Sequence, residues 1–315
     1  MLKMAKSEEI HRPVMLQEVL RLLAPRPDGV YVDATVGAGG HAYEIAKWLE
    51  PGRGLLIGLD WDEEMLAHAR ERLAPFADRV RLLRRNFREL EAVLDELGVA
   101  QVDGVLFDLG VSSLHFDRPE RGFSFRHPGP LDMRMDRRAN KTAAEIVNKA
   151  SREELAKIFK EYGEERWAAR IAEAIVRARE RRRIETTDQL VEVVLGALPA
   201  RARRSRIHPA TRVFQALRIA VNEELENLRH GLEAAFRRLK PGGVLVVISF
   251  HSLEDRIVKR FFRERAGKGS QPMGLPPARG SEKEAELLGL FRPTPQEVAE
   301  NPRARSAKLR ALRKL

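Results

Sequence analysis

DATVGAGGHA, residues 33–42, is the most informative stretch of this chain. A short apolar run precedes it and a helical pattern follows, so it predicts a strand that turns into a helix around a ligand. Gly37, Gly39 and Ala42 satisfy the G-x-G-x-x-G/A pattern with which some sheets hold a dinucleotide. A purely structural turn rarely needs so many small residues, which serve where backbone approaches a ligand closely. We expect a cofactor site here, and the other strand ends decide its kind.

Five apolar runs rich in β-branched residues are predicted to form strands. Helical patterns such as Asp62–Leu73 and Leu90–Leu97 separate the first four runs, and this alternation is typical of a parallel α/β sheet with buried strands. A further strand is expected near Ala307–Leu312. The five runs are Val30–Val32, Leu55–Leu59, Val80–Leu83, Val102–Leu109 and Val244–Phe250.

The fifth run comes long after the fourth, and the sequence between them differs in kind. Residues 118–208 begin with a loop rich in Gly, Pro and Arg and continue as helical patterns, so they predict an inserted helical domain. The sheet domain then comprises residues 1–117 and 209–315, and residues 209–239 read as a helix that returns to the sheet. The inserted helical patterns cover Ala143–Tyr162, Glu165–Arg182 and Thr187–Leu198.

Positive charge is concentrated in the middle third of the chain. The formal net charge is +11, and residues 118–215 hold 23 Lys and Arg residues against 14 Asp and Glu residues. Such a block attracts polyanions, although solvated helix faces would give the same count. Phe116, Phe123, Phe125 and His127 lie among these arginines, a mixture that stacks bases and pairs phosphates. The alternative is that the rings are apolar plugs between two domains.

The chain contains no cysteine. This excludes disulfides, a thiolate nucleophile, Cys-ligated zinc and the His/Cys/Cys zinc site of base deaminases. No apolar run approaches the length of a membrane-spanning helix or of a signal peptide. We therefore expect a cytoplasmic protein without a membrane partner.

Strands of an open parallel sheet present ligand-binding residues at their carboxyl ends. Asp60 ends the second run, where a carboxylate suits the ribose hydroxyls of NAD or S-adenosylmethionine; the alternative is an N-cap of the next helix, for which Asp62 is also available. Phe87 follows the third run and suits either an adenine face or the core. Asp108 ends the fourth run before a loop of small residues, and a buried carboxylate there requires a cation or a hydrogen-bond donor.

The fifth run ends at a histidine and a candidate helix start. His251 lies at the same predicted edge of the sheet, either as a functional group or, as the residue type favours, as a structural histidine. Ser252 and Asp255 have the spacing of a capping box, with an apolar helix face after them.

Eight longer strings are spread over nearly the whole chain: HRPVMLQEVL, DATVGAGGHA, DGVLFDLGVSS, RGFSFRHPGPLDMRMD, YGEERWAARIAEAIV, HPATRVFQALRIAVNEEL, ISFHSLEDRIVKRFF and AENPRARSAKLR. They resemble the bacterial ribosomal RNA small subunit methyltransferase H family. The resemblance implies a class I S-adenosylmethionine-dependent methyltransferase, with a Rossmann-like, mostly parallel sheet and an inserted all-helical domain. It also implies methyl transfer to N4 of a cytidine in the decoding region of 16S rRNA. The expected partner is therefore 16S rRNA or the 30S subunit, and not DNA; no oligomeric state is predicted.

Motif position in the family implies a set of cofactor contacts, to which the glycine pattern adds Gly37. The implied contacts are Gly39, Gly40, His41, Asp60, Phe87, Asp108 and His115.

The chemistry asks for an amine held in line with a sulfonium methyl group, without a covalent intermediate. Methylation at carbon 5 of cytosine usually needs a cysteine, so the absence of cysteine favours transfer to nitrogen or oxygen. Amino-methyltransferases of DNA carry a (D/N/S)-P-P-(Y/F) motif after strand four, whereas this chain has Asp108-Leu109-Gly110-Val111. No metal is required.

We hypothesise that Asp108, with Ser112 or Ser113, lies at the methyl-transfer centre, and that His251 or residues 123–127 frame the cytosine. Two alternatives stay open at this point. An NAD-dependent oxidoreductase would explain the glycines and Asp60 but gives the basic block no role. A non-catalytic RNA-binding protein on the same fold would explain the charge but not the set of polar strand ends.

Overall fold

The computed structural model describes residues 13–203, 207–268 and 283–315, apart from the side chain of Ser113. The chain forms two compact units. The first, here called the sheet unit, comprises Met1–Gly110 and Leu225–Leu315, and the second, the helical unit, comprises Val111–Glu224. The segment predicted as an inserted domain, residues 118–208, lies wholly within the helical unit, whose limits are wider at both ends.

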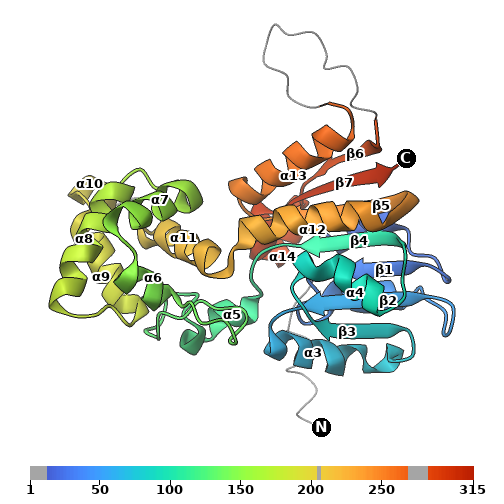
Figure 1. The fold of residues 1–315 in the computed structure, drawn as a ribbon, viewed down its shortest axis with the longest axis horizontal. Coiled ribbons are helices and arrows are strands. Elements are labelled where there is room, and N and C mark those ends of the chain that lie inside the picture. Colours follow the sequence, from blue (N-terminus) through green and yellow to red (C-terminus); the bar gives the residue numbers. More distant parts are fainter. Residues whose placement is uncertain (1–12, 204–206, 269–282) are drawn as a thin grey trace, which may run out of the picture. The chain divides into compact units, whose positions relative to one another are not determined.

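The sheet unit is built on a seven-stranded sheet with the order β3-β2-β1-β4-β5-β7-β6 (Figure 1). Neighbours among the first five strands run parallel, and β7 pairs antiparallel with both β5 and β6. The mostly parallel α/β sheet is therefore confirmed. The strands are β1 (Val30–Asp33), β2 (Leu55–Asp60), β3 (Val80–Arg84), β4 (Val102–Asp108), β5 (Leu239–Ser249), β6 (Ala285–Phe291) and β7 (Lys308–Lys314).

The edge strand β6 was not predicted. Its sequence, AELLGLF, contains no β-branched residue, and Gly289 within it has a φ of 135° where the pairing with β7 shifts register. Such a segment lacks the compositional signal of a strand. It is a strand because it adds to β7 at the edge of a sheet that already exists.

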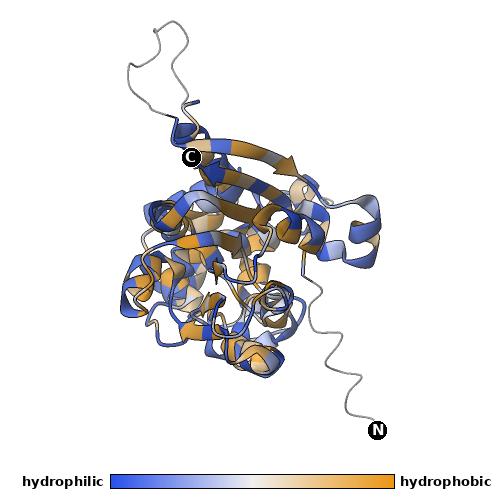
Figure 2. Cartoon of the chain, turned by 90° about the vertical axis from the view of Figure 1, so that its right-hand side faces the viewer, coloured by the Kyte–Doolittle hydropathy of each residue, from blue (hydrophilic) through white to orange (hydrophobic). Residues whose placement is uncertain are grey.

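Helices cover both faces of the sheet because β strands present apolar side chains on alternate faces. One face packs against α4 (Leu90–Glu96), α12 (Glu224–Arg238) and α13 (Ser252–Arg265), of which α4 and α12 are drawn in front of the strands in Figure 1. The other face packs against α1 (Leu16–Leu23), α2 (Gly40–Ala46) and α3 (Glu63–Leu73). The strands carry mostly hydrophobic colours in Figure 2, as a sheet buried on both faces requires.

Short elements complete the sheet unit. They are the 3₁₀ turns η1 (Ala74–Phe76), η2 (Phe87–Glu89) and η4 (Pro302–Ser306), and the helix α14 (Pro295–Glu300). The Gly/Pro-rich segment noted in the sequence, residues 267–280, lies largely outside the described residues.

The helical unit has its own apolar core. In it α7 packs against α8 and α11, and α8 against α9. The elements are α5 (Ser113–Asp117), η3 (Pro119–Arg121), α6 (Ala143–Lys149), α7 (Arg152–Gly163), α8 (Ala168–Arg181), α9 (Thr187–Ala197), α10 (Ala200–Arg203) and α11 (Ala210–Asn222).

Two of the predicted long helices are wrong, because each is broken. The pattern over residues 143–162 divides at Ser151, whose side chain accepts a hydrogen bond from the Glu154 N–H while Glu154 caps in return. Residues 209–239 divide at Glu223, which adopts the left-handed conformation with a φ of 50° and so ends α11. Consequently α11 belongs to the helical unit, and only α12 returns to the sheet.

Among the described residues, no helix is both long and apolar enough to cross a membrane.

Candidate active site

Three aspartates end three neighbouring parallel strands of the sheet unit. Asp33 ends β1, Asp60 ends β2 and Asp108 ends β4. The register pairs Asp33 with Gly58 of β2 and with Leu106 of β4. The three carboxyl groups are therefore delivered to one edge of the sheet, as the sequence predicted for parallel strand ends.

The glycine turn connects β1 to α2 at this edge. Gly37 and Gly39 have φ values of 51° and 82°, in the left-handed region that glycine adopts without strain. A Cβ on Gly39 would lie 3.4 Å from the Ala69 Cα of α3, and one on Gly40 would lie 3.4 Å from the Pro13 Cβ. Beside Gly37 the nearest atom would be 3.9 Å away, so room for a ligand next to the turn lies at Gly37.

Asp60 holds the glycine turn in place. Its Oδ2 accepts a hydrogen bond of 3.0 Å from the Gly37 N–H, and its Oδ1 accepts one of 2.9 Å from the Asp62 N–H. The cap of α3 is Asp62, whose side chain accepts from the Glu64 N–H. The alternative that Asp60 serves as the helix cap is therefore wrong, and Asp60 instead joins the ends of β1 and β2.

His41, at the second position of α2, is buried between backbone and carboxyl groups. Its Nε2 lies 2.9 Å from the Val14 carbonyl oxygen, and its Nδ1 lies 3.5 Å from Oδ2 of Asp108. The Asp108 N–H donates to Oγ1 of Thr35, at 2.6 Å. The other carboxyl oxygen of Asp108, Oδ1, is buried and has no hydrogen-bond partner among the described residues.

Burial perturbs all of these titratable groups. It raises the pKa of Asp33 to about 7, although the adjacent His41 acts in the opposite direction. It raises the pKa of Asp60 to about 7 against the hydrogen bonds from Asp62 and Gly37. Burial also raises the pKa of Asp108 to about 7, with a further contribution from the Glu254 carboxylate, and it lowers the pKa of His41. Clusters of perturbed groups at strand ends are typical of functional sites.

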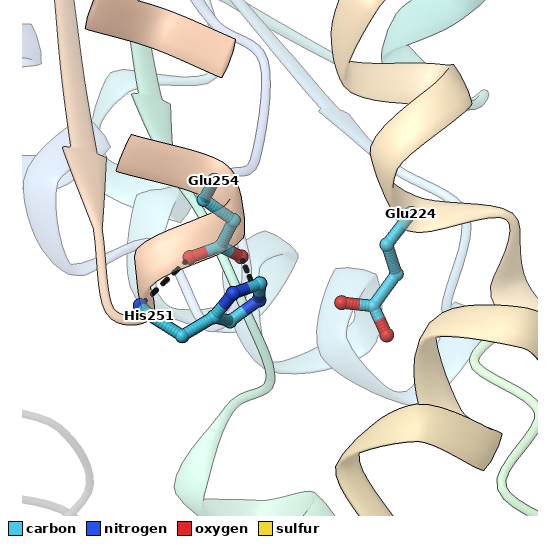
Figure 3. A group of neighbouring side chains, drawn as sticks. All are labelled: Glu224, His251 and Glu254. Carbon is cyan, nitrogen blue, oxygen red and sulfur yellow. Dashed lines mark hydrogen bonds and ion pairs between the residues drawn. The ribbon is translucent and has the colours of Figure 1, made fainter. Parts of the chain in front are cut away.

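The end of β5 brings His251 and Glu254 to the same edge. The Glu254 carboxylate accepts hydrogen bonds from the backbone N–H groups of Phe250 and His251, at 2.9 and 3.3 Å, and lies 3.1 Å from Nε2 of His251 (Figure 3). The predicted capping box of Ser252 and Asp255 is therefore wrong. Asp255 instead pairs with Lys308 and Arg310 of β7.

Glu224, also drawn in Figure 3, belongs to the helical unit, where it forms a bidentate ion pair with Arg218.

Phe87 is partly buried against the core. Its ring meets Phe107 edge to face at a centroid distance of 5.4 Å, and a Cβ on Gly231 of α12 would collide with it. The residue thus packs as the core alternative expected, while part of its surface remains exposed.

Three candidates from the sequence, Ser112, Ser113 and His115, fall in the helical unit. The Ser112 N–H donates to Nδ1 of His115, at 3.2 Å, and the Ser112 hydroxyl caps α5. The His115 ring is buried beside Phe123, at a centroid distance of 5.0 Å. The side chain of Ser113 lies outside the described residues.

The aromatic loop of the helical unit is more buried than expected. Phe123 is 5% exposed and lies under the Arg121 guanidinium, and Phe125 packs against Phe214. Because a buried ring cannot stack on a base, the expectation that Phe123 does so is wrong. Phe116, which is 40% exposed, remains available.

Two residues of the site escaped sequence reasoning. Glu254 looks like an ordinary surface charge in the first turn of a helix, yet it is 3% exposed and caps α13 from within. Thr35, inside the glycine stretch, holds the backbone of Asp108. The available signal for Glu254 was its position three residues after His251, the spacing at which an N3 side chain reaches back to an N-cap.

The strand order with one antiparallel strand, the glycine turn after β1 and the acid ending β2 define a class I methyltransferase fold. A model of the MraW methylase family matches residues 8–315. The chain belongs to this family.

Two curated relatives are named ribosomal RNA small subunit methyltransferase H. The one from Symbiobacterium thermophilum is 55% identical over 308 residues, which cover 97% of this chain and 96% of the relative. The one from Geobacter sulfurreducens is 56% identical over 310 residues, which cover 97% and 99%. The resemblance noted in the sequence is confirmed, and the alternative of an NAD-dependent oxidoreductase is set aside.

A solved structure of an rRNA methylase from Streptococcus thermophilus is 13% identical, with a TM-score of 0.44, over 97% of this chain and 98% of that one.

Proposed function

We propose that this protein transfers the methyl group of S-adenosylmethionine to N4 of a cytidine in the decoding region of 16S rRNA, at position 1402. The relatives' names support ribosomal RNA of the small subunit as the substrate. The observation in the structure that carries the proposal is the group of strand-end carboxyls around the glycine turn. Within that group, Oδ1 of Asp108 is buried without a partner among the described residues.

The residues present fit S-adenosylmethionine. Asp60 already accepts two backbone hydrogen bonds, and the remaining lone pairs of its partly exposed carboxylate suit the two ribose hydroxyls. The open side of Gly37, with Gly39, Gly40 and His41 after it, would hold the methionine part. Phe87 would contact the adenine, and His115 is a further proposed contact.

The cofactor would supply an electrophilic methyl group on a sulfonium centre. The protein then has to hold the cytosine amine in line with that methyl group and to exclude water. In this proposal Oδ1 of Asp108 accepts a hydrogen bond from the amine. A buried oxygen without a hydrogen-bond donor destabilises the protein, and the amine of the bound substrate would supply that donor. Ser112 or Ser113 is proposed to act with Asp108 at the methyl-transfer centre, and His251 to frame the base. The single-step displacement needs no metal.

The helical unit supplies the RNA contact in this proposal. Arg170 and Arg181 lie along one face of α8, and both are exposed. Neither takes part in an ion pair or hydrogen bond within the part of the chain that the structure describes. Guanidinium groups spaced along one helix face can follow phosphates of a nucleic-acid backbone. An rRNA substrate also places the proposed reaction in the cytoplasm, with no DNA or membrane partner.

Two measurements test the proposal. Calorimetric titration should show saturable binding of S-adenosylmethionine and none of NAD. Transfer of a radiolabelled methyl group to 30S particles that lack the modification should occur, and mass spectrometry should place the label at N4 of the cytidine. Binding of S-adenosylmethionine without transfer to any 30S preparation would favour the non-catalytic alternative, and label at another base would overturn the assigned position.

A further inference from the structure

His41 lies in a fixed position between a backbone carbonyl and a carboxyl group of the sheet unit. The side chain is 5% exposed, with Nε2 at 2.9 Å from the Val14 carbonyl oxygen and Nδ1 at 3.5 Å from Oδ2 of Asp108. Both neighbours come from other elements, since Val14 precedes α1 and Asp108 ends β4. The ring is therefore held from two sides.

The Val14 contact decides where the imidazole carries hydrogen. A carbonyl oxygen only accepts hydrogen bonds, so Nε2 of His41 is the donor, and in the neutral ring Nδ1 has no hydrogen. A bare Nδ1 and a carboxylate oxygen repel each other because both are acceptors. The 3.5 Å contact is accordingly stable only with a proton between the two groups.

That proton can lie on either side. One form is an imidazolium beside a carboxylate, and the other is a neutral imidazole that accepts a hydrogen bond from a protonated carboxyl group. The two forms contain the same number of protons and the same net charge, so the pair behaves as one titrating unit.

Among the described residues, the other charged groups with the largest effects on this pair are acidic. Asp33 of β1 and Glu297 of α14 act on His41, and Glu254 of α13 acts on Asp108. Asp60 of β2 acts on Asp33 in turn. Negative neighbours on all these elements stabilise the bound proton.

We propose that His41 is a positioning residue that shares one proton with Asp108 and thereby fixes the orientation of that carboxyl group. With Oδ2 tied to His41, Oδ1 is left as the acceptor that meets the ligand. The shared proton is a property of the protein alone, whereas its consequence for methyl transfer rests on the function proposed above. The segment containing Val14 anchors the arrangement through its carbonyl group.

The direct test is nitrogen-15 spectroscopy of histidine-labelled protein without ligand, across a pH range. We expect the His41 Nε2 to remain protonated throughout and the Nδ1 signal to report proton sharing. Asp108→Asn should shift the His41 titration by more than one pH unit. A spectrum with the proton on Nδ1 and a bare Nε2, or a His41 titration unchanged by Asp108→Asn, would overturn the proposal.

Kinetics supply the second readout. His41→Gln keeps a donor for the Val14 carbonyl but cannot hold the shared proton. We expect kcat near pH 7 to fall about 10- to 100-fold, with a KM for RNA close to that of the wild type and with a changed pH profile. His68→Gln, on α3 and outside the site, is the matched control. If no 30S preparation is methylated, the functional proposal fails, while the spectra still decide the His41–Asp108 pair.

Discussion

Single carboxyl groups at the strand ends hold the backbone of the candidate site in place. Asp60 accepts the Gly37 N–H and so holds the glycine turn, and in the proposed function its remaining lone pairs also accept from the ribose hydroxyls. The sequence placed Asp60 at a strand end but left open whether it capped a helix. In the structure the N-cap of α3 is Asp62, two residues after Asp60.

Asp60→Asn should weaken cofactor binding. The amide nitrogen would face one of two backbone donors, from Gly37 or Asp62, and would no longer accept a hydroxyl hydrogen. We expect the Kd for S-adenosylmethionine to rise about 10- to 100-fold, which corresponds to roughly 1.4–2.7 kcal/mol. Calorimetry measures it. Asp62→Asn is the control, because asparagine is a good N-cap; an equal loss in both variants would mean that only the loop was disturbed.

The raised carboxyl pKa values make the free protein more stable in mild acid. Asp33, Asp60 and Asp108 each have a folded-state pKa of about 7, above the ordinary value of 3.8. Between about pH 7 and pH 4 the folded chain therefore binds protons that the unfolded chain does not, so the free energy of unfolding rises as pH falls. The lowered pKa of His41 has the opposite effect below pH 6.5, because there the unfolded chain binds one proton on this histidine that the folded chain does not.

Denaturant titrations at several pH values measure this effect. Each fully shifted carboxyl contributes at most about 1.4 kcal/mol per pH unit. Asp108→Asn should remove the contribution of Asp108 and alter that of His41, while the contributions of Asp33 and Asp60 persist. A wild-type stability that falls steadily from pH 7.5 to pH 5.5 would contradict the raised pKa values.

At the scale of elements, the chain ends several helices without glycine. Ala24 after α1, Glu164 after α7 and Glu223 after α11 all adopt left-handed backbone conformations, with φ values of 42°, 48° and 50°. An L-residue there costs roughly 1–2 kcal/mol. The break at Glu223, inside the helix predicted over residues 209–239, was missed because the usual marker of a helix end is glycine.

Ala24→Gly should stabilise the protein. The exposed Ala24 donates its N–H to the Leu20 carbonyl in a helix-ending turn, which glycine adopts without strain. Against the greater entropy of unfolded glycine, we expect a net gain of about 0.5 kcal/mol. Thermal unfolding measures it. Ala67→Gly, within α3, should instead lose about 1 kcal/mol, and destabilisation by both changes would contradict the assigned conformation.

Other elements were predictable because several signals agree. The strands β1 to β5 combine apolar runs with flanking turns, and the parallel order of β1 to β4 follows from the helices between them. The strand ends then identified Asp33, Asp60 and Asp108. Glu254 was missed because its burial depends on α13 packing against the sheet, whereas the local spacing after His251 indicates only a helix cap.

For the whole molecule, the excess of positive charge favours a polyanionic partner, which in the proposed function is RNA. The net charge is +11, and most of the excess lies in residues 118–215. Charge placed in this way gives binding that depends on salt, because each phosphate contact releases counterions.

Arg170→Glu combined with Arg181→Glu should reduce the salt dependence of RNA binding. If each arginine contacts one phosphate, the slope of log Kd against log salt should fall in magnitude by about 1.4–1.8. Affinity measurements between low and moderate salt check this. Arg292→Glu with Arg305→Glu, in the sheet unit, changes the net charge equally. The same loss of slope in this control would mean that overall charge, and not α8, determines binding.

The sheet unit is assembled from two separate lengths of chain, with β1 to β4 before the helical unit and β5 to β7 after it. Because β4 and β5 pair directly, neither length alone can complete the hydrophobic core between them. The polypeptide cut within the helical unit would consist of two fragments that are inert apart and gain activity only on reassociation. The topology thus suits the chain to a split-protein assay. Each fragment would be fused to one of two test proteins, and methyl transfer would be measured as the signal that those two proteins bind each other.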